Sequence, residues 1–115
     1  SLKQNQTGPA IDHLRTAVKL DPRNSAAHNN LGAALARQGR LNEAFEQYRI
    51  ALKLNPEYAE AYNNVGMLLL RKGRDAEAAD LFNKALQLDP QHDGARKNLD
   101  RLQAEGRSPA GKVDL

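Results

Sequence analysis

The feature that most constrains this chain is an internal repeat, in which the block 21–54 is followed directly by a second copy at 55–88. Shifting the sequence by the length of one block aligns Asp21-Pro22 with Asn55-Pro56 and then with Asp89-Pro90. Fourteen positions of the first block hold the same residue in the second. A fixed period of this kind indicates stacked copies of one supersecondary unit, because each copy buries its apolar face against the next.

Within each copy, the apolar residues follow the spacing of an α-helix rather than that of a strand. Two apolar stripes flank a turn, Gln38-Gly39-Arg40 or Lys72-Gly73-Arg74, in which glycine can take the left-handed conformation that ends a helix. Each copy is therefore predicted to be two helices and a turn, closed by the prolines at 22, 56 and 90. The stripes comprise Ala27, Leu31, Ala34 and Leu35, then Ala44, Tyr48, Ala51, Leu52 and Leu54; and Ala61, Val65, Leu68 and Leu69, then Ala78, Leu81, Phe82, Ala85, Leu86 and Leu88.

Small and aromatic residues recur at fixed places in the two copies. Gly32 and Gly66 remove side chains where two helix backbones must approach, and Tyr48 and Phe82 are predicted to fill the space between neighbouring copies. The recurring set is His28, Leu31, Gly32, Leu35, Ala44, Tyr48, Ala51 and Pro56, then Tyr62, Val65, Gly66, Leu69, Ala78, Phe82, Ala85 and Pro90. This set resembles the tetratricopeptide repeat (TPR) family over roughly residues 10–104. The resemblance implies an all-α, right-handed superhelical solenoid of antiparallel helix pairs with about six helices.

The period also predicts how the chain is divided. Polar residues 1–9 and Gly/Pro-containing residues 105–115 are predicted to be disordered segments on either side of a domain at 10–104. Within the domain we expect an unpaired second helix at 10–22, full repeats at 23–56 and 57–90, and a capping helix at 91–104.

The unpaired helix at 10–22 lacks the partner that precedes it in a full repeat. Ile11, Leu14 or Val18 are therefore expected to present apolar surface. Such a surface suggests a homo-oligomer formed through exposed terminal helices, or a chain taken from a longer array.

The TPR resemblance implies that a partner protein or peptide binds along the concave face lined by the first helices. Asn30, Ala33 and Arg37 share one helical face, and the same face recurs in the next copy. A side-chain amide has both a donor and an acceptor, so an asparagine row can bond the backbone of a threaded peptide, and arginine can clamp a carboxylate. The predicted peptide-binding residues are Asn29, Asn30, Ala33, Arg37, Asn63, Asn64, Met67, Arg71 and Asn98.

Each of these assignments has a structural alternative. The asparagines are equally suited to bonding neighbouring helices together, and arginine in a last helical turn is favoured by the helix dipole alone. Met67 is also typical of a partly buried groove lining. The Lys–Asn carboxylate clamp of chaperone-binding TPR domains is not expected here, because Asn29 and Ala33 occupy the corresponding positions.

Other classes of function find little support in the composition. The net charge is +3, with 17 basic and 14 acidic residues interleaved, which does not favour nucleic acid binding. Cysteine is absent, the three histidines share no ligand spacing, and no catalytic constellation or phosphate loop is present, so we predict no metal, no cofactor and no enzymatic activity. No signal or membrane-spanning segment is apparent, so no membrane insertion is expected and a cytoplasmic location is favoured.

The predicted function is therefore a non-catalytic protein–protein interaction module that binds a peptide in the concave groove of its helices. Two alternatives remain at this point. One is a self-assembly scaffold that associates through exposed repeat ends. The other is a regulatory fragment of a larger enzyme whose catalytic domain lies elsewhere.

Overall fold

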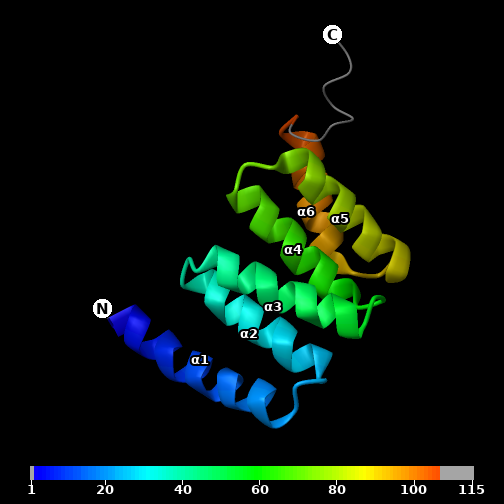
Figure 1. Cartoon of the computed structure of the whole chain (residues 1–115). Helices are drawn as coiled ribbons and strands as arrows, with labels where there is room; N and C mark the ends of the chain where they lie inside the picture. The colour runs from blue at the N-terminus through cyan, green and yellow to red at the C-terminus, as the bar shows by residue number, and fades with distance from the viewer. Residues whose placement is uncertain (1, 107–115) are drawn as a thin grey trace. The chain divides into compact units, whose positions relative to one another are not determined.

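The computed structural model describes residues 2–106, with side chains from residue 8 onward. These residues form six α-helices and no strand (Figure 1). The helices are α1 (Leu2–Leu20), α2 (Ser25–Arg37), α3 (Leu41–Leu54), α4 (Ala59–Arg71), α5 (Asp75–Leu88) and α6 (Asp93–Ala104). The predicted all-α fold and the predicted number of helices are confirmed.

The chain divides into two compact units at the predicted boundary between the repeats. Unit 1 is Ser1–Pro56 and unit 2 is Glu57–Leu115. In unit 1, α2 packs against both α1 and α3, and in unit 2, α5 packs against both α4 and α6, while α4 also touches α6. Each unit therefore holds one complete antiparallel helix pair, α2–α3 or α4–α5, with one further helix packed on that pair.

The two helices of each pair are joined by a turn that glycine makes possible. Gly39 and Gly73 adopt φ angles of 79° and 76°, in the left-handed region that other residues disfavour. The backbone N–H of Arg40 then bonds the carbonyl of Leu35 at 3.0 Å, and Arg74 bonds Leu69 at 2.9 Å. These bonds satisfy carbonyls that the helix end would leave unpaired, and they confirm the predicted turns.

The core of each pair is a close approach between a glycine and an aromatic ring. A Cβ atom placed on Gly32 would lie 2.6 Å from Cε1 of Tyr48, and one on Gly66 would lie 2.5 Å from Cε1 of Phe82. Both rings are buried, at 2% and 0% exposure. The glycine thus leaves a notch on the first helix that the aromatic residue of the second helix fills, so tight packing requires both residue types.

The N-terminal helix is longer than predicted. The segment 1–9 was expected to be disordered, but α1 begins at Leu2 and continues through Pro9. Leucine, lysine and glutamine favour helix, and the N-terminal turns extend a helix whose later turns are packed on α2. The helix continues through Gly8-Pro9 although an interior proline removes a backbone donor and crowds the carbonyl four residues earlier.

The unpaired helix also covers more of its apolar surface than expected. Ile11 is buried, at 3% exposure, so the prediction that it presents apolar surface is wrong, whereas Leu14 and Val18 are half-buried. At the other end of the chain, α6 stops at Ala104, and residues 107–115 of the predicted tail lie outside the described residues.

Candidate functional site

In unit 1, the predicted binding residues lie on α2 and differ in depth. Asn30 and Arg37 are exposed and Ala33 is half-buried, so these three residues form one accessible face of the helix. Asn29 is only 4% exposed. Its side chain therefore offers little surface to a ligand, and the accessible part of the predicted set in this unit is Asn30, Ala33 and Arg37.

In unit 2, the corresponding residues on α4 follow the same division. Arg71 is exposed, Asn64 is half-buried, and Met67 is 45% exposed, a large value for an apolar side chain. Asn63 is 4% exposed, which matches Asn29 in the preceding repeat. The accessible face of α4 is therefore Asn64, Met67 and Arg71.

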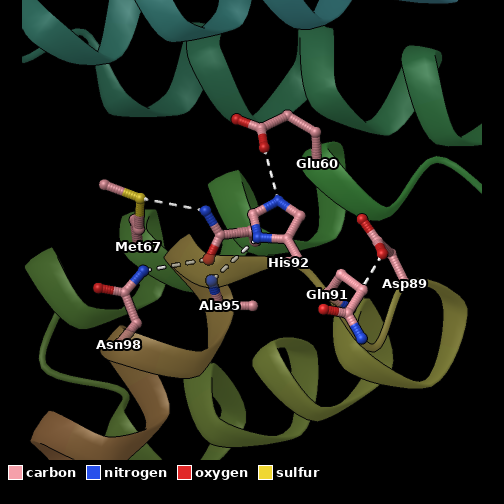
Figure 2. Close-up of polar contacts among 8 residues, drawn as sticks. Glu60, Met67, Asp89, Gln91, His92, Ala95 and Asn98 are labelled. Atoms are coloured by element: carbon pink, nitrogen blue, oxygen red, sulfur yellow. Dashed lines mark hydrogen bonds and ion pairs between the residues drawn. The ribbon is translucent and has the colours of Figure 1, made fainter.

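Asn63 connects α4 to α6 through its side-chain amide. Its oxygen accepts a hydrogen bond from Nδ2 of Asn98 at 3.0 Å, and its nitrogen donates to Sδ of Met67 at 3.6 Å. Figure 2 labels both partners, Asn98 and Met67, and marks their contacts with dashed lines. The structural alternative for the asparagines was that they bond neighbouring helices together. Such a bond is present, but its partners are Asn98 and Asn63, not Asn64. We therefore assign Asn63 to packing, while Met67 and Asn98 border it at the surface.

His92 caps the N-terminus of α6 and joins it to α4. Its Nδ1 accepts a hydrogen bond from the backbone N–H of Ala95 at 3.0 Å, and its Nε2 lies 2.6 Å from the Glu60 carboxylate (Figure 2). Because Nδ1 is an acceptor in this arrangement, the proton must sit on Nε2 and be donated to Glu60. The sequence analysis missed this role. The period offered a signal, since His92 lies two repeat lengths after Asn24, the N-cap of α2.

His28 has a comparable bridging role in unit 1. Its Nε2 lies 2.8 Å from the carbonyl oxygen of Pro22, and its Nδ1 lies 2.8 Å from the side-chain amide of Gln47 on α3. A carbonyl oxygen only accepts, so Nε2 carries a proton and donates to Pro22. The Gln47 atom beside Nδ1 is the amide oxygen, and a neutral ring accepts a hydrogen bond there only when the amide is turned over to present its NH2 group. The sequence placed His28 correctly at a packing position but did not reveal its polar partners.

The part of the chain that the structure describes contains no group of three or more histidine, cysteine, aspartate or glutamate side chains placed to hold a metal ion. Among the same residues, no helix has the length and apolar character needed to cross a membrane.

Comparison with family models identifies the repeat. A model described as "Tetratricopeptide repeat" matches residues 22–91, and one described as "TPR repeat" matches residues 2–39. The chain belongs to the tetratricopeptide repeat family. The resemblance noted from the repeated glycine, alanine and aromatic positions is confirmed, and the second match includes the part of α1 that the sequence analysis had predicted to be disordered. No curated protein matches this TPR chain.

Solved TPR structures share the fold. YrrB, a TPR protein with an unusual peptide-binding site, is 29% identical with a TM-score of 0.75 over 84% of this chain. The first TPR of Spaghetti (RPAP3), bound to the HSP90 peptide SRMEEVD, is 25% identical with a TM-score of 0.79 over 90% of this chain and 82% of that one. MamA, at 23% identity and a TM-score of 0.77 over 92% of this chain, is similar in fold. This TPR chain spans 50% of the YrrB chain and 63% of the MamA chain.

Proposed function

We propose that the chain is a non-catalytic protein-interaction module that holds a peptide segment of a partner protein. Each unit offers its own surface to a peptide: the accessible face of α2 in unit 1, and the accessible faces of α4 and α6 in unit 2. TPR domains are generally interaction modules, and two of the structural relatives are described with a peptide or a peptide-binding site. The association of these relatives with peptides supports a protein-interaction function. The choice of binding residues in this chain is our own assignment.

The observation that carries the proposal is the recurrence of one accessible face. Asn30, Ala33 and Arg37 on α2 recur as Asn64, Met67 and Arg71 on α4, and all six are exposed or half-buried. The asparagine amides can bond a peptide backbone without selecting its sequence, and the arginines can bond carboxylates through two parallel hydrogen bonds. The two faces differ only at the middle position, where alanine is replaced by the adaptable side chain of methionine.

Within unit 2, the exposed Met67 gives this face its specificity. Met67 is 45% exposed, and its sulfur accepts a hydrogen bond from the Asn63 amide. An apolar side chain of the peptide can therefore contact Met67 while Arg71, one turn further along, bonds an acidic residue. We propose that the preferred ligand carries an apolar residue near an acidic one.

An array of synthetic peptides tests this function. Wild-type protein is compared with an Arg37→Glu/Arg71→Glu variant on peptides that contain apolar and acidic residues. We expect the variant to lose about tenfold or more in affinity, because each arginine becomes a like charge that repels the peptide. A Lys53→Glu/Lys84→Glu variant changes the net charge equally at exposed positions of α3 and α5, outside the proposed faces, and should bind as wild type does.

The asparagines are tested separately. Asn30→Ala/Asn64→Ala should weaken binding of most peptides to a similar degree, because the amides bond the backbone, whereas Asn83→Ala on α5 serves as the matched control. Asn98 is left unchanged in this experiment because its side chain already bonds Asn63. Equal capture by wild type and by both the arginine and the asparagine variants would refute the proposed surface. Concentration-dependent sedimentation of the unliganded chain that the variants do not alter would favour self-assembly instead.

A further inference from the structure

A surface cleft of about 430 Å³ lies in unit 1, away from the face assigned above. It is lined by residues of all three helices of the unit: Arg15, Thr16, Val18 and Lys19 of α1, Leu31 of α2 and Gln47 of α3. Successive residues of a helix are turned by about 100°, so Leu31 lies roughly 130° around α2 from the centre of the Asn30, Ala33 and Arg37 face. The cleft and that face are therefore separate surfaces of the unit.

The cleft combines an apolar base with a basic rim. Val18 is half-buried and supplies the accessible apolar atoms, while Leu31, at 1% exposure, lies beneath them. Arg15 and Lys19 are one helical turn apart on α1 and both are exposed, which places two cations along the same helical face. The amide of Gln47 is held in place by its bond to His28.

The acidic groups nearest to this rim leave its charge largely available. Arg15 lies 3.4 Å from a Glu43 oxygen, a long contact, while Arg40 holds the same carboxylate at 2.7 and 2.9 Å. Asp12 is exposed one turn before Thr16, whose hydroxyl donates to the Asp12 backbone carbonyl. A ligand carboxylate therefore competes only with a weak ion pair for Arg15.

The equivalent cleft in unit 2 is similar in size but differs in charge. It measures about 480 Å³ and is lined by Asp80, Asn83, Leu86 and Gln87 of α5 and Arg96 of α6. Two repeat lengths separate Arg15 from Asn83, Val18 from Leu86 and Lys19 from Gln87. The repeat therefore builds the cleft twice and keeps the apolar residue, but the two cations of the first cleft are replaced by two neutral amides in the second, which also has one acidic and one basic lining residue, Asp80 and Arg96.

We propose that the cleft of unit 1 is a second docking site, which receives an acidic peptide segment carrying an aliphatic side chain beside a carboxylate. The aliphatic side chain contacts Val18, and the carboxylate bonds Arg15 and Lys19. Charge complementarity selects an acidic ligand, and the apolar base selects a peptide over a phosphate polymer. Two cations neutralise too few phosphates to hold a nucleic acid or a lipid surface, each of which depends on a larger basic patch.

The test uses two labelled synthetic peptides at low ionic strength, one alternating leucine and aspartate and one alternating leucine and asparagine. Fluorescence anisotropy should show the acidic peptide binding and the neutral peptide binding at least about tenfold more weakly. NMR of the isotope-labelled chain should place acidic-peptide shifts at Thr16, Lys19 and Gln47. Shifts confined to the α2 and α4 faces, or equal binding of both peptides, would overturn the proposal.

The second cleft supplies the matched variants. Arg15→Asn/Lys19→Gln gives unit 1 the residues that α5 carries at the same positions, and it should reduce affinity for the acidic peptide about tenfold while leaving the helical circular dichroism unchanged. Asn83→Arg/Gln87→Lys, made in that background, should restore binding, with the NMR shifts moved to unit 2. If the first variant kept full affinity for the acidic peptide, the proposal would be overturned. The same holds if anionic vesicles or oligonucleotides bound the chain and the acidic peptide did not. The Arg37→Glu/Arg71→Glu variant should retain these cleft shifts, so failure of either proposal is recognised independently of the other.

Discussion

The helix pairs α2–α3 and α4–α5 reach the same backbone arrangement with different interiors. Both contain the glycine notch and the aromatic ring that fills it, Gly32 with Tyr48 and Gly66 with Phe82. Beside that shared contact, the first pair uses a polar bridge, in which His28 bonds Gln47, whereas Tyr62 and Leu81 occupy the same positions of the second pair.

This difference separates what the fold requires from what it tolerates. The notch leaves no space for a side chain, so the residue types there are set by geometry. At the bridge, the first pair gives a buried polar ring its hydrogen-bond partners, whereas the second pair has two half-buried residues, Tyr62 and Leu81, at the same positions. The fold therefore accepts different residue types there. Substitutions at each of these positions test that distinction.

The largest effect is expected at the notch. Gly32→Leu and Gly66→Leu should each destabilise the chain by about 3 kcal/mol or more, because the new side chain would overlap a buried aromatic ring. Urea unfolding followed by circular dichroism measures the loss. Gly8→Ala is the control, since a Cβ at this helical glycine meets nothing within 4 Å and alanine favours helix. A wild-type unfolding free energy for either leucine variant would show that the notch is not required.

The polar bridge should show an intermediate effect that depends on its partner. Gln47→Leu alone leaves Nδ1 of the buried His28 without a partner and should cost about 1–3 kcal/mol. His28→Tyr/Gln47→Leu reproduces the residues of the second pair and should cost less than the sum of the single changes. A double-mutant cycle gives the coupling free energy, which we expect to be about 1 kcal/mol. Additive single effects would mean that the two side chains act independently.

These two sites illustrate how far the sequence alone leads. The close approach at Gly32 and Gly66 was predicted from their recurrence at fixed spacing. The aromatic residues were predicted to fill the space between neighbouring copies, which is wrong for their main contact, because Tyr48 and Phe82 pack on the glycine of their own pair. The bridge was not predicted, because a histidine at a packing position does not reveal which polar atoms of other elements lie within reach. The start of α1 was missed because a polar segment with a glycine and a proline has low helix propensity. The sequence does not show that this segment continues a helix whose later turns pack on α2.

The candidate binding residues show the same limit. Helical periodicity predicted which residues share a face on α2 and on α4, and it placed Asn30 and Arg37 on an accessible surface. It did not predict that Asn98 would bond Asn63 instead of continuing a row with Asn64. That choice depends on how α6 is inclined against α4, which residue spacing within one helix does not encode. The basic cleft was missed for a similar reason, since it is formed by residues of three helices.

A smaller effect is expected at the start of α2, where the two pairs also differ. The side chain of Asn24 accepts a hydrogen bond from the backbone N–H of Ala27 at 3.1 Å, whereas the corresponding residue Tyr58 makes no such cap. Asn24→Ala should therefore destabilise the chain by about 1 kcal/mol, measured by thermal or urea unfolding. Asn24→Ser keeps an acceptor and should stay close to wild type. A loss of stability in Asn24→Ser equal to that in Asn24→Ala would point to a role other than capping.

The smallest effect concerns ion pairs at the surface of α3. Hydrogen bonds from Arg40 hold the pKa of Glu43 below its ordinary value of 4.5, and Arg49 lowers the pKa of Glu46 in the same way. A carboxyl group with a lowered folded-state pKa stabilises the protein above its unfolded pKa, and this contribution is lost as the pH falls through the folded value. The free energy of unfolding should therefore decline below about pH 4.5. The decline should be small, because both ion pairs are exposed and screened by solvent. Glu43→Gln/Glu46→Gln should flatten that part of the urea-unfolding profile, and an unchanged slope would show that other carboxyl groups account for the decline.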